Sequence, residues 1–329
     1  MTLNSEALAN SEWGDWAPKA SPLFKWAGGK QKFLWHHTEY LPKFSGTYHE
    51  PFGGGLSIFF HYVSRSPQSP LVSRLGDTNV RLIKTYQAIK TDWRKVANQL
   101  AQLEAAFQVS NDKEAFYYDT REAHNLIHPK EDAARFIFLM QAGWNGVFRS
   151  NSKGKFNVPV GSLNRSIALP NADDLRAVSA ALQFSTLRAS SWETSVTAVK
   201  AGDFVFLDPP YYKLANSTTT LYDQNNPFEF NEQQKLAKAL SDLERVGANF
   251  VLTNSAYPEI VELYRDHGFR VDIVLTARSI NSKTADRGFQ DEIIVRPKPK
   301  DLDSDVSITL DLMLKLNKAR KTRNERTIK

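Results

Sequence analysis

Short apolar runs alternate with longer amphipathic stretches in the first and last parts of the chain. Residues 204–207 form the clearest run: it holds Val and Phe, it is short, and two prolines follow it, which together predict a buried strand. Between residues 84 and 189 this alternation stops, and apolar residues recur with a helical period. The pattern therefore predicts an α/β fold with an inserted, mainly helical domain.

The predicted elements follow from the same pattern. Strands are expected at residues 47–50, 71–77, 204–207, 249–253, 270–277 and 292–296. Helices are expected at residues 30–40, from 56 onward, and at 79–90, 93–107, 113–125, 131–144, 172–184, 231–246 and 258–267. Asn231 with Gln234 three residues on predicts a capping box for the helix at 231–246.

These elements suggest a discontinuous organisation. We expect residues 21–83 and 190–299 to form one α/β domain, with residues 84–189 inserted into it. Residues 1–20 are expected to be a flexible leader and residues 300–329 a basic tail.

Inside the insertion, alternation about Ser152-Lys153-Gly154 predicts a β-hairpin over residues 147–159. The polar face of this hairpin carries Arg149, Asn151, Lys153, Lys155 and Asn157. Side chains of these types contact the phosphates and base edges of nucleic acids. The alternative is a solvated hairpin that binds nothing.

Composition narrows the class of protein. The 329 residues are 41% hydrophobic and 24% charged, as in ordinary globular proteins. The absence of cysteine excludes disulfides, thiolate zinc sites and a cysteine nucleophile, and it fits a reducing compartment without proving one. We expect a cytoplasmic protein. We expect no metal site, because the seven histidines include no HExxH pair. No apolar run could span a bilayer, and the polar N-terminal residues predict no signal peptide.

The net charge of +6 suggests a polyanionic partner without establishing one. Its distribution is more informative, because basic residues concentrate at residues 149–155, 278–287 and 315–329. The first of these groups falls in the predicted hairpin.

Asp208 follows the predicted strand at 204–207 and is followed by Pro209, Pro210 and Tyr211. Ligands of open α/β sheets bind at the carboxyl ends of strands. An exocyclic nucleobase amine is a poor nucleophile, and Asp208 with the Pro209 carbonyl could accept its two hydrogens while Tyr211 stacks on the base. The alternative is a strand followed by a proline-rich turn with a capping Asp.

A strand ending at Glu50, the turn Pro51-Phe52-Gly53-Gly54 and a helix after it favour an adenosine-containing cofactor, because glycines let a ligand approach the backbone. Asp77 ends the next strand and could accept both ribose hydroxyls. The alternative role of Asp77 is the N-cap of the helix at 79–90. Trp26 and Lys30 flank two glycines in a tight turn, which is either part of this site or a simple entry to a helix.

Taken together, these stretches resemble the Dam-type DNA adenine-N6 methyltransferases. The resemblance rests on residues 25–30 (Lys-Trp-Ala-Gly-Gly-Lys), 50–54 (Glu-Pro-Phe-Gly-Gly), 76–79 (Gly-Asp-Thr-Asn) and 208–211 (Asp-Pro-Pro-Tyr), and on residues 144–149, 156–159, 278–280 and 291–292. It runs from about residue 22 to residue 295 in the order of the family. It implies a Rossmann-like class I methyltransferase sheet that uses S-adenosyl-L-methionine, with residues 84–189 as the target-recognition domain.

The resemblance also implies two sets of contacts. The cofactor contacts would be Trp26, Lys30, Asp77 and Asp208. The DNA contacts would be Lys25 and Arg149 on guanines, and Val147 and Pro159 on a thymine methyl. The implied target is adenine in GATC of double-stranded DNA, flipped out of the helix. We expect a monomer, with two molecules on one palindromic site as the alternative, acting in restriction–modification or in DNA replication.

Two positions depart from the family. Leu56 stands where the family usually has Gly, and Val160-Gly161-Ser162-Leu163 replaces the usual Phe-Gly-Arg-Tyr. Two other functions stay open: a catalytically silent DNA-binding module of the same fold, and an RNA base methyltransferase. The intact Asp208 and Tyr211 disfavour the first, and the inserted hairpin disfavours the second.

Overall fold

The structure is a computed structural model that describes residues 19–24, 26–65, 70–163, 167–212, 228–277 and 289–298. The chain divides into two compact units, Met1–Pro297 and Lys298–Lys329, and the description concerns the first. Several predicted features lie outside the described residues: most of the leader, Lys25, the long loop after Tyr212, residues 278–280 and the basic tail.

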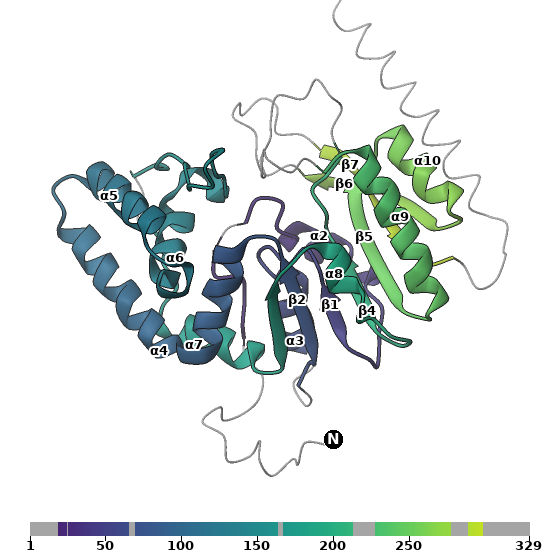
Figure 1. The fold of residues 1–329 in the computed structure, drawn as a ribbon, viewed down its shortest axis with the longest axis horizontal. Coiled ribbons are helices and arrows are strands. Elements are labelled where there is room, and N and C mark those ends of the chain that lie inside the picture. Colours follow the sequence, from purple (N-terminus) through teal and green to yellow (C-terminus); the bar gives the residue numbers. More distant parts are fainter. Residues whose placement is uncertain are drawn as a thin grey trace, which may run out of the picture. The chain divides into compact units, whose positions relative to one another are not determined.

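The sequence folds into a seven-stranded sheet in the order β3-β2-β1-β4-β5-β7-β6. The strands are β1 (Tyr48–Glu50), β2 (Ser73–Asp77), β3 (Ser185–Ala189), β4 (Phe204–Leu207), β5 (Asn249–Ser255), β6 (Arg270–Ala277) and β7 (Phe289–Arg296). The first five strands pair in parallel, and β7 is antiparallel to both of its neighbours. The predicted α/β fold with a mostly parallel sheet is confirmed (Figure 1).

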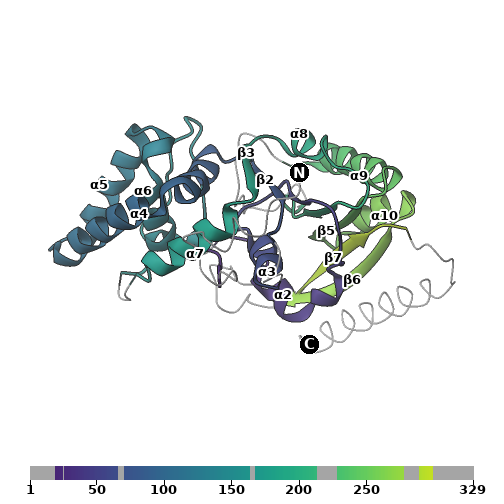
Figure 2. The same cartoon turned by 90° about the horizontal axis from the view of Figure 1, so that it is seen from below.

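Helices cover both faces of the sheet. In Figure 2, α2 (Gln31–His36) and α3 (Ser57–Arg65) lie on one side, and α8 (Trp192–Val196), α9 (Phe230–Arg245) and α10 (Pro258–Asp266) lie on the other. Strand β4 is packed on both faces of the sheet. Phe204 and Phe206 belong to one of the two buried apolar clusters, and Val205 and Leu207 belong to the other. A strand buried on both faces has a continuous apolar sequence, which explains why the sequence located β4 with the correct bounds.

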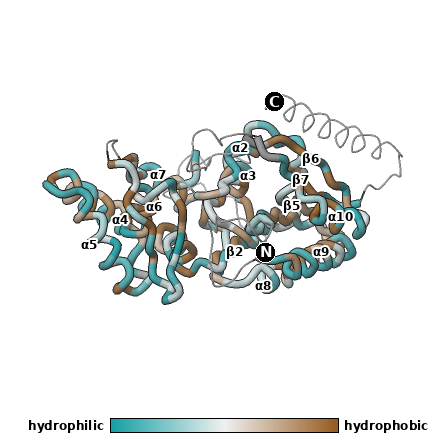
Figure 3. The backbone as a smooth tube through the Cα atoms, turned by 90° about the horizontal axis from the view of Figure 1, so that it is seen from above, coloured by the Kyte–Doolittle hydropathy of each residue, from teal (hydrophilic) through white to brown (hydrophobic). Residues whose placement is uncertain are grey.

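The inserted helices are α4 (Val80–Val109), α5 (Lys113–Leu126), α6 (Ala133–Ala142) and α7 (Ala172–Leu182). Helix α4 has a kink at Asp92, where the backbone leaves the helical region (φ −152°, ψ 76°). Asp92 Oδ1 accepts a hydrogen bond from Lys95 N at 3.0 Å, as an N-cap does, and this kink separates the two helices predicted here. Hydrophobic colour marks α6 in Figure 3, and this helix is buried along almost its whole length.

Three sequence predictions differ from the structure. Residues 185–189 fall within the predicted insertion, but they form β3 and pair in register with β2. The capping box at Asn231 is wrong, because α9 begins at Phe230 and Glu229 at its N-cap makes no side-chain hydrogen bond. The helix expected at residues 30–40 is divided into α2 and a short 3-10 turn, Thr38–Tyr40. Among the described residues, no helix is long and apolar enough to cross a membrane.

Candidate active site

Four parallel strands bring their carboxyl ends to one edge of the sheet. Glu50 ends β1, Asp77 ends β2, Asp208 follows β4, and Thr253 lies near the end of β5. Because neighbouring strands are in parallel register, these polar side chains meet at a single edge. The three carboxylates that the sequence marked therefore lie along one edge of the sheet.

Both carboxylate oxygens of Asp208 are engaged. Lys30 Nζ lies 2.6 Å from Oδ2, and Thr253 Oγ1 donates a hydrogen bond to Oδ1 at 2.8 Å. Lys30 is buried, and its ammonium also donates to the carbonyl of Gly28 at 3.0 Å. The arrangement compensates the charge of a carboxylate that is largely withdrawn from water.

Tyr211 lies beside this ion pair. The Lys30 Nζ is 5.0 Å from the centroid of the Tyr211 ring, within the range of a cation–π contact. The Tyr211 hydroxyl donates to Glu292 Oε2 of β7 at 3.0 Å. Burial, followed by the charges of Asp208 and Glu292, raises the pKa of Tyr211 well above its usual value, so the ring stays neutral.

Buried polar side chains of β5 hold the segment that carries Tyr211. Asn254 Oδ1 accepts from Tyr212 N at 3.2 Å, and Ser255 Oγ donates to the Tyr212 carbonyl at 2.9 Å. Asn254 Nδ2 in turn donates to Gln233 Oε1 at 2.8 Å. The sequence interpretation missed these supports; the available signal was Thr-Asn-Ser at the end of an otherwise apolar strand.

Glu50 is fully enclosed at the end of β1. Its Oε2 accepts from the Tyr48 hydroxyl at 2.7 Å and from Phe59 N at 3.2 Å. Burial raises the pKa of Glu50 to about 8; the Tyr48 hydrogen bond opposes the rise and the charge of Asp208 adds to it. Glu50 therefore joins β1 to the first turns of α3, and its predicted contact with a cofactor stays a prediction.

Asp77 fastens the glycine-rich turn to the next strand. Its Oδ2 accepts from Gly54 N at 2.9 Å and its Oδ1 from Asn79 N at 2.8 Å. The alternative role as N-cap of α4 is wrong, because Asn79 is the N-cap and accepts from Leu82 N at 3.1 Å. Burial raises the pKa of Asp77, and the backbone amides oppose this rise. Each oxygen of the Asp77 carboxylate has a second lone pair, so Asp77 can still accept a hydrogen bond from a ribose hydroxyl.

The turn after Glu50 requires glycine for two reasons. Gly54 has φ +47°, and a Cβ there would lie 2.7 Å from Nε1 of Trp26, which packs against the turn. Gly53 donates from its N to the Gly76 carbonyl at 2.7 Å, so β2 approaches the turn closely. Pro51 is buried, and Phe52 stacks on Trp192 with ring centroids 6.4 Å apart. The missing side chains at Gly53 and Gly54 therefore make room for β2 and for Trp26 to pack on the turn.

Leu56, where the family usually has Gly, adopts φ +56°. Left-handed backbone favours glycine, so this leucine carries backbone strain. Its side chain is almost fully buried and fills the space beside Gly53, where an added methyl group would lie 3.0 Å from Leu56 Cδ2. Burial of the Leu56 side chain offsets this backbone strain.

The segment 147–159 reverses direction as predicted, but it forms an isolated bridge, Ser150 to Phe156, instead of two continuous strands. Asn151 Oδ1 accepts from the backbone N of Lys153 and Lys155, at 3.0 and 3.1 Å, so this side chain stabilises the turn itself. Lys153 and Lys155 are exposed. We refer to residues 147–159 as the reading loop.

Three residues proposed to read bases differ in exposure. Val147 is 6% exposed, whereas Pro159 is exposed. Arg149 donates from Nε to Asn157 Oδ1 at 2.8 Å and from Nη2 to the Asn157 carbonyl at 3.0 Å. The Arg149 guanidinium is therefore held in a fixed orientation by the opposite arm of the loop. The contact that Val147 would make with a thymine requires the loop to open around it.

Helix α5 fixes the second arm of the reading loop. Asn125 makes two hydrogen bonds to the backbone of Phe156, accepting from N at 2.8 Å and donating to O at 3.1 Å. Arg121 Nη1 and Tyr117 Oη both donate to the Val158 carbonyl, at 3.2 and 3.1 Å. The sequence interpretation missed this support, although polar residues at a spacing of four on the helix predicted at 113–125 were a signal for it.

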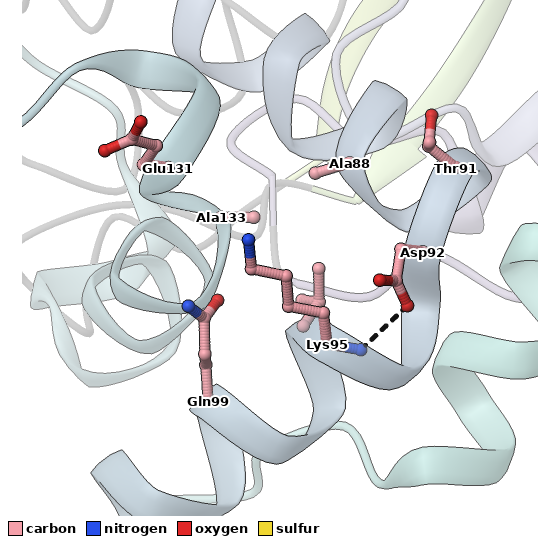
Figure 4. A pocket seen from close by; sticks show the side chains of 8 residues that line it. Ala88, Thr91, Asp92, Lys95, Gln99, Glu131 and Ala133 are labelled. Carbon is pink, nitrogen blue, oxygen red and sulfur yellow. Dashed lines mark hydrogen bonds between the residues drawn. The ribbon is translucent and has the colours of Figure 1, made fainter.

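A separate hollow of about 310 Å³ lies at the kink of α4. Asp92, Lys95 and Gln99 from α4 face Glu131 and Ala133 across it (Figure 4). The polar lining residues are exposed and carry both signs of charge, and none was marked by the sequence. We assign no function to this hollow. Among the described residues, no group of three acidic or histidine side chains could hold a metal ion.

Comparison with known proteins connects this geometry to a reaction. Residues 26–280 match the sequence profile of the D12 class N6 adenine-specific DNA methyltransferases. The type II methyltransferase M1.LlaDCHI of Lactococcus lactis subsp. cremoris is 30% identical over 281 residues, covering 83% of this chain and 94% of that protein. The DNA N-6-adenine-methyltransferase of Escherichia phage P1 is 33% identical over 274 residues, which are 83% of this chain but 35% of that protein. A DNA adenine methylase of Vibrio cholerae serotype O1 is 26% identical over 281 residues, or 84% of this chain and 95% of that protein.

Proposed function

Since this chain belongs to the D12 class of N6 adenine-specific DNA methyltransferases, we propose that it transfers a methyl group from S-adenosyl-L-methionine to adenine N6 within GATC. The observation that carries this proposal is the cluster of Asp208, Lys30 and Tyr211 at the carboxyl end of β4. The proposed substrate is double-stranded DNA, bound by a monomer.

The chain's residues fit the cofactor. Asp77 accepts a hydrogen bond from Gly54 N, so the proposed ribose acceptor lies at the glycine-rich turn. Trp26 supplies a flat ring against the same turn. When bound, S-adenosyl-L-methionine supplies an electrophilic methyl group. The residues of this edge would bind and orient it, and Asp77 would accept a hydrogen bond from a ribose hydroxyl.

Asp208 and Pro209 would act on the base. The lone pair of adenine N6 is delocalised into the ring, and accepting both of its hydrogens favours the pyramidal, nucleophilic form. Asp208 Oδ2 and the Pro209 carbonyl are the proposed acceptors, and the carboxylate also opposes the positive charge that develops on nitrogen. The proton can leave after transfer, so no base with a shifted pKa is required.

The Lys30 ammonium occupies the position on Asp208 that the incoming amine would take. Its ammonium sits on Asp208 Oδ2, the same oxygen proposed to accept from adenine N6. It also lies over the Tyr211 ring, on which the base would stack. We therefore expect adenine to compete with Lys30 for this oxygen. Stacking on the tyrosine, about 1–3 kcal/mol per base, would offset much of the cost of flipping.

The test is methyl transfer to defined duplexes. Purified protein with labelled S-adenosyl-L-methionine should methylate a GATC duplex, and each single-base change in the site should slow the reaction. Modified-base sequencing of DNA from a methylation-free host that expresses the chain should report N6-methyladenine in one motif. Methylation of RNA in preference to duplex DNA, or tight DNA binding with no transfer, would replace the proposal with one of the two alternatives.

A further inference from the structure

One aromatic contact joins the proposed cofactor site to the reading loop. The rings of Trp26 and Phe148 are stacked, with centroids 6.2 Å apart and planes inclined by 15°. Trp26 precedes the turn that leads to Lys30, and Phe148 is the neighbour of Arg149. Stacked aromatic pairs of this geometry stabilise their contact beyond simple burial.

On one side, Trp26 is packed onto the glycine-rich turn. A methyl group added at Gly54 or at Gly55 would come within 2.7 or 3.1 Å, respectively, of Trp26 atoms. Gly54 is fixed from two other directions, because Asp77 accepts from its N at 2.9 Å and the Tyr86 hydroxyl donates to its carbonyl at 3.3 Å. Any shift of this turn on cofactor binding therefore moves the Trp26 ring.

On the other side, Phe148 is packed into the base of the reading loop. Its ring lies 6.1 Å from that of Phe136 on α6 and 5.8 Å from that of Phe156 on the opposite arm. The next residue, Arg149, is held on Asn157 of that arm. A displacement of Phe148 therefore changes the relative position of the two arms, and with it the direction of the Arg149 guanidinium.

We propose that Phe148 is a positioning residue that couples the two sites through Trp26, so that cofactor binding and recognition of the cognate duplex strengthen each other. This inference rests on the proposed function and adds a regulation of the same site. Coupling between two binding sites is reciprocal: the factor by which cognate DNA raises cofactor affinity equals the factor by which cofactor raises DNA affinity. The coupling factor is therefore the quantity to measure.

The probe is S-adenosylhomocysteine, the unreactive product of methyl transfer. Its dissociation constant is measured by calorimetry for the full chain alone, with a saturating GATC duplex, and with a duplex altered at one guanine. We expect cognate DNA to tighten binding about fivefold or more in the wild-type protein, the lower end of typical coupling, and the altered duplex to do so less. Phe148→Leu should reduce the factor to near one, and Phe148→Tyr, which keeps the ring, should restore it.

Phe116→Leu is the matched control. This half-buried ring on α5 packs on Phe107 and Phe138, at 5.6 and 5.9 Å, so the variant removes an aromatic contact of the helical insertion without touching Trp26. It should keep the wild-type coupling factor. Thermal unfolding verifies that each variant is folded, and Phe148→Met, which retains volume without a ring, replaces Phe148→Leu if that variant is unfolded.

Two results would overturn the inference: a wild-type factor of one, or an unchanged factor in folded Phe148→Leu. Equal losses of cofactor affinity with and without DNA would also leave the factor unchanged and mark Phe148 as merely structural. Failure of the proposed function would look different, because the wild-type protein would then not bind S-adenosylhomocysteine or not methylate the GATC duplex.

Discussion

Lys30 Nζ and Asp208 Oδ2 form a partly buried ion pair of 2.6 Å at the carboxyl end of β4, and Thr253 Oγ1 donates to the second oxygen of the same carboxylate. The two residues come from distant stretches of the sequence. The Lys30 side chain is 10% exposed to water and the Asp208 side chain 20%. The two contacts orient the carboxylate that we propose accepts a hydrogen bond from the incoming base.

Replacing Asp208 by Asn is expected to slow methyl transfer at least about a hundredfold, the scale for losing one preorganised electrostatic partner. The amide keeps the shape but loses the charge that opposes the developing ammonium. Asp242→Asn, an exposed site on α9, is the control and should retain full rate. Near-normal single-turnover rates for both Asp208→Asn and Asp208→Ala would remove Asp208 from the reaction.

Asp77→Ala is expected to weaken cofactor binding by about 1.5–3 kcal/mol, the range for hydrogen bonds to a charged group. DNA affinity without cofactor should change little. The control is Asn79→Ala, which removes the N-cap of α4 at a cost of about 1 kcal/mol in stability but leaves Asp77 in place. Calorimetric titration distinguishes the two, and unchanged cofactor affinity in folded Asp77→Ala would limit Asp77 to a structural role.

At Leu56 we expect Gly to be tolerated better than Ala. Both substitutions remove a buried side chain, a loss of about 2–5 kcal/mol for Leu→Ala. Only Gly relieves the left-handed strain at φ +56°, which amounts to about 1 kcal/mol. Urea unfolding should therefore give Leu56→Gly the greater stability of the two. The reverse order would mean that the remaining methyl group outweighs the backbone strain.

The raised pKa of Glu50, about 8, predicts a pH dependence of stability. The folded state keeps the Glu50 proton at pH values where the unfolded chain, with an ordinary pKa of about 4.3, releases it. The free energy of unfolding therefore falls as pH rises from about 4.3 towards about 8, by up to about 1.4 kcal/mol per unit. The side chain of Gln does not titrate, so the free energy of unfolding of Glu50→Gln should rise relative to that of the wild type across this pH range. Denaturant unfolding at several pH values measures this, and a constant difference would contradict it.

Arg149 and Lys153 should give different signatures on DNA. Arg149→Ala should cost about 1–3 kcal/mol on the cognate site and little on a site altered at the guanine it reads. Exposed Lys153→Ala should weaken cognate and altered sites alike and reduce the salt slope by about one unit. Affinities for single-base variants at two salt concentrations test both. Uniform weakening by Arg149→Ala would make it a phosphate contact, and no effect would remove the main support for GATC.

The sequence predicted two strands with their observed bounds. Strand β4 is buried on both faces, and β6 is an edge strand whose residues 271–275 still form an apolar run apart from Asp272. Strand β3 was missed because it is an edge strand of five residues, of which only Ser185 and Leu187 are buried, so it has no apolar run. The capping box at Asn231 failed because Phe230 packs against Tyr212, with ring centroids 5.9 Å apart, and the helix begins one residue earlier.

Within the site, motif residues were predictable and their supports were not. Asp77 and Asp208 stand at strand ends, which a sequence pattern can locate. The contacts that orient them come from elsewhere in the chain: Thr253 on Asp208, Asn125 on the backbone of Phe156, and Trp26 against Phe148. A pattern of local periodicity carries no information on such pairs, because tertiary packing alone brings them together.

The position of β1 between β2 and β4 also sets an order of events during synthesis. Thr47 N donates to Asp203 Oδ1 across 156 residues of chain, and Tyr48 pairs with Phe204. Until β4 leaves the ribosome, β1 has an unpaired edge and its aromatic neighbours lack their cover, whereas the helices of the insertion can pack locally. Long-range parallel pairing is slow, and exposed strand edges aggregate. A nascent chain that ends within the insertion is therefore expected to aggregate more readily than a chain that includes β4.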